Sequence, residues 1–146
     1  MKNTVLAFLV LSLCIGCDGA TLNPNPFAGT WLGHGELTET DKPIAGQTTV
    51  TTIDDVITFN ADMTFSLDQG YRQTVDGVLA MSAYQKGAGT YAYAGDTTGI
   101  LTMTFGIPSD PSLSNDTPAY TFSGDKKTCT IQPTNITFPL VFEKVR

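Results

Sequence analysis

The feature that most constrains the fold is a period-two alternation of apolar and polar residues that begins at Trp31, the only tryptophan. Such alternation is typical of strands with one buried face. Within Phe27-Ala28-Gly29-Thr30-Trp31, the large Trp31 side chain is expected to anchor the core, and Gly29 permits a sharp entry into the strand. Asn23-Pro24-Asn25-Pro26 just upstream cannot continue a helix. We therefore expect the folded domain to begin at about Phe27 and to span residues 27–146.

The alternation recurs in short segments that are separated by turn residues. Residues 72–86 fit a strand after Asp76-Gly77 better than a short helix. We expect loops over 39–46 and 107–118, and a β-bulge near Asp54-Asp55, where the alternation slips. The remaining strands are predicted at 29–37, 47–59, 63–67, 88–94, 100–105, 120–122, 129–131 and 138–144.

About eight short strands follow one another through hairpin turns, and no second set of elements is predicted to cover a flat sheet. Closing the sheet on itself buries one apolar face of every strand and removes the exposed edges. The sequence therefore predicts an all-β fold, a small antiparallel up-and-down β-barrel of about eight strands.

The N-terminus has the pattern of an export signal. Lys2 precedes an apolar run from Val5 to Leu13, which is too short to span a bilayer and typical of a signal peptide. The following Leu13-Cys14-Ile15-Gly16-Cys17 resembles a bacterial lipobox, although Cys14 stands where that motif usually has leucine. The resemblance implies a lipoprotein signal peptide over 1–16, fatty acylation of Cys17, for example with palmitate, and a tether over 17–26. An ordinary secretory signal is the alternative.

Acylation of Cys17 implies attachment to a lipid bilayer, since each buried CH₂ contributes about 0.8 kcal/mol. The expected location is the bacterial cell envelope. Asp18 resembles an inner-membrane retention signal of enteric bacteria, but this rule differs between phyla, so both membranes remain open.

Charge and residue content exclude several functions. The net charge is −6 and no cluster of Lys or Arg occurs, which argues against nucleic-acid binding. His34 is the only histidine and is expected to point away from the face of Trp31, so neither a metal site nor a Ser-His-Asp triad is predicted. Cys129 is expected to act as a small buried hydrophobe. We expect no enzyme activity and no cofactor.

Several short motifs resemble small bacterial lipocalin-like domains: Phe27-x-Gly29-Thr30-Trp31, Ile57-x-Phe59, Gly89-Thr90-Tyr91, Tyr120-x-Phe122-Ser123-Gly124-Asp125 and Phe142-x-Lys144. The resemblance implies a barrel in which a basic residue of the last strand covers the tryptophan. By strand parity this residue is Lys144, and Arg146 shares that parity. The expected structural residues are therefore Gly29, Trp31, Lys144 and Arg146.

An eight-stranded barrel either fills with side chains or holds one small ligand. The first hypothesis is a barrel that binds a small hydrophobic or amphipathic molecule. The alternative is a filled barrel that contacts an envelope protein, as an interaction or inhibitor module, through loops 39–46 and 107–118. The residues expected to line a ligand site are Trp31, Phe65, Tyr91, Tyr93, Met103, Phe105, Tyr120 and Phe122.

Overall fold

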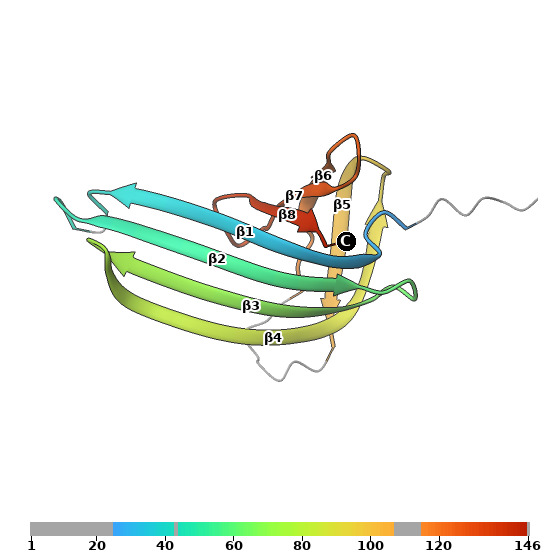
Figure 1. The fold of residues 1–146 in the computed structure, drawn as a ribbon, viewed down its shortest axis with the longest axis horizontal. Helices are drawn as coiled ribbons and strands as arrows, with labels where there is room; N and C mark the ends of the chain where they lie inside the picture. Colours follow the sequence, from blue (N-terminus) through green and yellow to red (C-terminus); the bar gives the residue numbers. More distant parts are fainter. Residues whose placement is uncertain (1–24, 43, 107–114, 146) are drawn as a thin grey trace, which may run out of the picture.

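The computed structural model describes residues 25–42, 44–106 and 115–145, and its strands form a closed antiparallel barrel in which strand order follows the chain (Figure 1). This confirms the predicted all-β up-and-down barrel, which is consistent with a small lipocalin-like barrel. The eight strands are β1 (Gly29–Thr40), β2 (Thr48–Phe59), β3 (Thr64–Val75), β4 (Val78–Ala94), β5 (Thr98–Phe105), β6 (Ala119–Phe122), β7 (Thr128–Gln132) and β8 (Leu140–Lys144).

Several predicted features lie outside the described residues. These are the signal peptide over 1–16, Cys17, Asp18, the first part of the tether, most of loop 107–118 and Arg146. Among the residues that the structure describes, no helix is long and apolar enough to cross a membrane.

Tight turns set the register of the hairpins. Asp76 and Gly77 both have positive φ angles, of 50° and 77°, as a two-residue turn between twisted strands requires. Asp76 also accepts a hydrogen bond from the backbone N–H of Thr48 through Oδ1, at 2.9 Å. The strand predicted after Asp76-Gly77 is therefore confirmed, and it runs unbroken into the strand predicted at 88–94.

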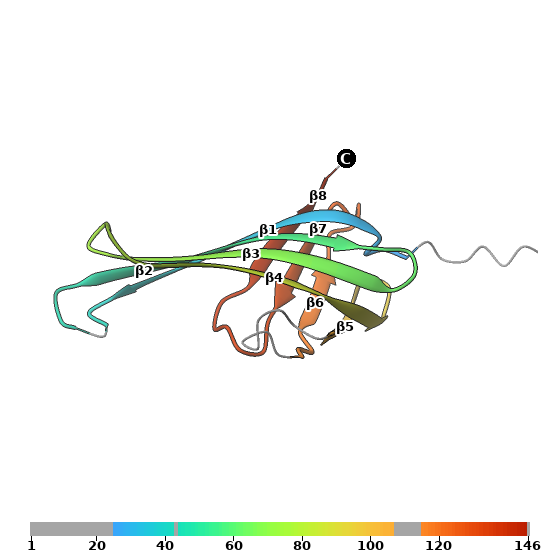
Figure 2. The ribbon, with the colours of Figure 1, turned by 90° about the horizontal axis from the view of Figure 1, so that it is seen from below.

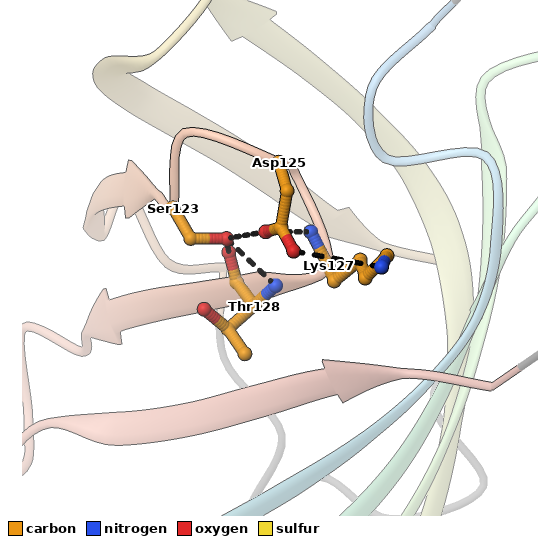
Figure 3. A network of polar contacts seen from close by, with 4 residues as sticks. All are labelled: Ser123, Asp125, Lys127 and Thr128. Atoms are coloured by element: carbon orange, nitrogen blue, oxygen red, sulfur yellow. Dashed lines mark hydrogen bonds and ion pairs between the residues drawn. The ribbon is translucent and has the colours of Figure 1, made fainter.

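The turn between β6 and β7 is held by its own side chains (Figure 3). Ser123 Oγ donates to Asp125 Oδ1 at 2.7 Å and accepts from the Thr128 N–H at 3.1 Å. The backbone N–H of Lys127 donates to the same Asp125 oxygen at 3.1 Å. The Ser123-Gly124-Asp125 motif therefore closes a hairpin.

Two local predictions were wrong. The bulge predicted near Asp54-Asp55 is absent, because β2 pairs with both neighbours without a register shift over its described length. The alternation of apolar and polar residues is interrupted there because a charged residue, Asp55, occupies an inward position of a regular strand. The register shift lies between β3 and β4, where Ala80 has no partner residue on β3. Glu39 and Thr40, predicted to lie in a loop, extend β1.

β2 has nearly the predicted extent of 47–59, but β1, β3 and β4 are longer than predicted. β1 to β3 have 12 residues each and β4 has 17, whereas β6 has only 4. β4 pairs with β5 only over Gly89–Ala94, and β1 pairs with β8 only over Trp31–His34. The first four strands therefore extend well beyond the barrel as a twisted sheet (Figures 1 and 2). We call this extension the arm and define it as residues 36–40, 48–52, 71–75 and 78–84.

The core lies inside the barrel and takes side chains from every strand. Two inward glycines of β1 do not leave free room there. A Cβ at Gly33 would lie 2.3 Å from the Phe142 ring, and one at Gly35 would lie 2.4 Å from a Leu140 methyl group. These glycines let β8 side chains pack directly against the β1 backbone.

Candidate functional site

An aromatic cluster fills the end of the barrel where the chain enters. Phe27 is 1% exposed and lies at its centre. Its ring centroid lies 4.9 to 6.2 Å from those of five rings, namely Phe59, Tyr91, Tyr93, Tyr120 and Phe122. Tilted and edge-on contacts at this spacing are the favoured aromatic geometry, so this end of the barrel is sealed.

Hydrogen bonds hold the entering segment in place. Trp31 Nε1 donates to the carbonyl of Phe27 at 2.6 Å, and the N–H of Phe27 donates to Asn25 Oδ1 at 3.0 Å. Asn25 Nδ2 donates to the hydroxyl of Tyr91 at 2.6 Å, and that hydroxyl donates to the Asn60 carbonyl at 2.9 Å. The buried polar atoms of Trp31 and Tyr91 therefore have partners.

Lys144 covers the tryptophan, as strand parity predicts. Its Nζ lies 5.2 Å from the centroid of the Trp31 ring, within the range of a cation–π contact. The Lys144 side chain also passes over Gly29, where an added Cβ would lie 3.0 Å from Cε. Gly29, Trp31 and Lys144 therefore form one contact at the barrel entrance.

A cavity of about 120 Å³ lies in the other half of the barrel. Since a water molecule occupies about 30 Å³, this is room for about four waters or a few carbon atoms. Apolar side chains form most of its wall, among them Leu67, Met103, Phe105, Ile131 and Phe142. The cavity reaches the surface near the exposed Asn135.

Asp55 is the buried charged group of this cavity. The residue is 5% exposed, and its Oδ1 has no hydrogen-bond partner. Burial raises the pKa of Asp55 to about 6; the hydrogen bond from Gln69 opposes this shift and the nearby charge of Asp54 adds to it. A buried carboxylate with an unsatisfied oxygen is costly unless another group donates to it. The lining of the cavity therefore includes a buried carboxylate with one unsatisfied acceptor oxygen.

The polar groups around the cavity favour one sign of charge. Gln69 lies opposite Asp55 in the β2–β3 ladder and accepts a hydrogen bond from Gln85 on β4. A second carboxylate, Asp116, lies at the mouth, where it accepts from the Thr117 N–H at 2.8 Å. The described lining contains no Lys, Arg or His. The cavity is therefore suited to hydrogen-bond donors or cations and unfavourable for anions.

A shallow groove of about 910 Å³ runs along the outer face of the sheet. His34 and Asp54 lie on its wall, and His34 Nδ1 is 2.7 Å from Asp54 Oδ1 in an exposed contact. His34 thus points outward, as predicted from parity. No group of three or more metal-ligating side chains occurs in the described parts of the chain.

The structure divides the residues expected to line a ligand site. Met103 and Phe105 line the cavity. Phe65 packs edge-on against Phe105, with ring centroids 5.1 Å apart. The other predicted residues, Trp31, Tyr91, Tyr93, Tyr120 and Phe122, belong to the aromatic cluster at the sealed end.

Sequence reasoning missed Asp55 and the central position of Phe27. A signal for Asp55 was present, because Ile53, Asp55, Ile57 and Phe59 share one parity and only one of them is charged. Cys129 is free and buried, and burial raises the pKa of its thiol to about 12, as suits an unreactive core residue.

Comparison of the sequence with models of known protein families gives no match, and comparison with curated proteins gives no significant relative.

Proposed function

We propose that this chain is a membrane-anchored cell-envelope lipoprotein whose barrel binds one end of a small amphipathic molecule. The observation that carries the binding proposal is the unsatisfied, buried Oδ1 of Asp55 in a cavity whose wall is mostly apolar. A buried polar group that lowers the stability of the fold because it lacks a hydrogen-bond partner is typical of a functional site. A hydroxyl or ammonium group of the ligand would donate a hydrogen bond to Asp55. The apolar part of the ligand would lie against Met103 and Phe105.

The size of the cavity limits what it holds. A volume of about 120 Å³ accommodates a polar head and a few carbons, and not a whole drug-sized molecule. A longer ligand would leave its remainder in the mouth near Asp116. Carboxylate-headed ligands such as free fatty acids are disfavoured, because Asp55 and Asp116 would repel them.

Titration with molecules of equal chain length and different head groups tests this proposal. Residues 18–146 include every described core residue and serve as the test protein. We expect hexylamine to bind more tightly than hexanol, and hexanoate to bind least, at neutral pH. The measurement is the displacement of methyl NMR signals of Met103 and Leu67 during titration.

Asp55→Asn is the decisive variant, and Asp54→Asn is its matched control. Both remove one negative charge from β2, but Asp54 is exposed on the outer face. Asp55→Asn should weaken hexylamine binding about ten-fold or more, since a hydrogen bond to a charged group contributes about 1.5–3 kcal/mol. Equal effects of the two substitutions would contradict a site at Asp55.

The lipoprotein proposal rests on the lipobox-like residues before Cys17 and is tested separately. We expect the full chain, expressed in a bacterium and fed an alkyne analogue of palmitate, to become labelled and to sediment with membranes. Cys17→Ser should abolish both properties, whereas Cys14→Ser should retain them. Labelling that survives Cys17→Ser would refute acylation at this position.

The alternative, a protein-interaction module, is favoured by a different observation. The arm exposes apolar side chains of β4 along an edge that no described strand covers. The predicted interaction loop 39–46 lies at the tip of the arm, and most of loop 107–118 lies outside the described residues. The arm edge is therefore the stronger candidate for an interaction surface.

A further inference from the structure

The outer edge of β4 between Val78 and Tyr84 has no neighbouring strand within the described part of the chain. β3 pairs with β4 from one side along the whole hairpin, but β5 pairs with the other side only over Gly89–Ala94. Alternate residues of 78–84 therefore direct their backbone N–H and C=O groups away from β3, in the part of the arm that lies beyond β5 to β8 (Figures 1 and 2). Such an edge is a template for another strand.

The side chains on this edge are apolar and exposed. Val78 is 70% exposed, Leu79 58%, Met81 48% and Tyr84 63%. The stretch 78–84 contains no charged residue and no proline. Natural edge strands usually carry charges or proline that prevent pairing with other chains. The absence of both from these residues marks this edge as one that accepts a strand.

The opposite edge of the arm differs. β1 is also without a described neighbour beyond its pairing with β8, which ends at His34. This edge carries Glu36 and Glu39, and two copies of it would bring like charges together. Pairing between two copies of the chain is therefore expected at β4 and not at β1.

We propose that two copies of this chain pair through their β4 edges, antiparallel and around a two-fold axis near Met81. The two arms then form one continuous sheet. This arrangement is closed, because each copy uses the same edge. Pairing of a β4 edge with a β1 edge would instead leave one edge of each type free and lead to open-ended assembly.

Charge and side-chain pairing support a second copy of the chain as the partner at the β4 edge. In an antiparallel pair centred on Met81, the Lys86 end of one strand lies beside the Asp76 end of the other. The bulge leaves Ala80 out of the ladder, so Leu79 then lies opposite Ser82 of the second copy, and Val78 lies opposite Ala83. The two members of each pair share a face of the sheet, as cross-strand contact requires.

Cysteine cross-linking in the full chain tests the proposal. Met81→Cys places two thiols next to the two-fold axis, so we expect a disulfide-linked band of twice the chain mass on non-reducing gels of intact cells. Thr38→Cys is the matched control, since Thr38 is an exposed residue of the β1 edge in the same arm. It has the same background cysteines and should give no such band.

A second pair of variants distinguishes specific pairing of the β4 edges from random collision of the introduced thiols. Adding Leu79→Lys to Met81→Cys places a lysine on each edge and should abolish the cross-link, whereas adding Thr38→Lys should leave it unchanged. Near-ultraviolet circular dichroism of both double variants checks that the barrel remains folded. A wild-type protein that sediments as a monomer, or equal cross-linking at positions 38 and 81, would overturn the proposal. Cross-linking that survives Leu79→Lys in a folded protein would do the same.

Discussion

Asp55 is the residue whose position is hardest to explain by stability alone. It lies on the same face of β2 as Ile57 and Phe59, which are buried in the core. Asp54, its neighbour in sequence, lies on the outer face and reaches His34. The two adjacent acids therefore provide an internal comparison, since one is solvated and the other is held in an apolar cavity.

The raised pKa of Asp55 gives a pH dependence of defined sign. Burial raises it from 3.8 in the unfolded chain to about 6, so the folded state holds the proton more tightly. The stabilising contribution of the protonated acid is therefore lost as pH rises from about 4 to above 6. Asp55→Asn should increase the free energy of unfolding by about 3 kcal/mol more at about pH 8 than at about pH 3.

Urea unfolding at both pH values measures this difference. Asp54→Asn controls for the loss of one negative charge from β2, since Asp54 is exposed on the outer face. If Asp55→Asn had the same effect at both pH values, Asp55 would be solvated in the folded protein, and the cavity site would lose its main support.

At the scale of elements, the arm depends on its hairpin turns more than on a core. Its residues at 78–84 are exposed, and only its inner part contacts the core, through Leu37 and Tyr71. The Asp76-Gly77 turn fixes the β3–β4 register, with Gly77 at a φ of 77°. A Cβ at Gly77 would meet no atom within 4 Å, so the cost of a substitution is conformational and not steric contact.

Gly77→Ala should lower the free energy of unfolding by about 1 kcal/mol, because an L-residue is strained at this φ. Gly124→Ala, in a turn that is equally open and without a positive φ, should change it by much less. Thermal unfolding followed by circular dichroism compares the two. A similar shift of the melting temperature in both variants would argue against the tight turn at Asp76-Gly77.

The barrel was predictable from sequence because alternation and turn residues are local signals. The strands beside Trp31, Tyr91 and Leu101 follow directly from period two, and so does the outward direction of His34. The arm was not predictable, because alternation does not show how far two strands remain paired, nor which part of β4 lacks β5 as a neighbour. The aromatic residues were recognisable from the sequence as inward-facing. Their division between the sealed end and the cavity was not recognisable, since it depends on Phe27, which packs against rings from β2, β4 and β6.

At the scale of the whole molecule, the proposed anchor and the proposed site lie at different ends of the barrel. The described chain begins at Asn25, beside the aromatic cluster that seals one end. The cavity opens at the other end, near Asp116 and Asn135. Attachment through acylated Cys17 and a short tether would place the sealed end towards the membrane and leave the cavity mouth accessible.

Native mass spectrometry tests the central claim, that the Asp55 cavity holds a ligand, most directly. Residues 18–146, purified from cells without detergent, should carry an additional small mass that is released on denaturation. Asp55→Asn should lose this mass, and Asp54→Asn should keep it. A wild-type protein that shows only the mass of its own chain, and that binds none of the three hexyl probes, would contradict the proposed function.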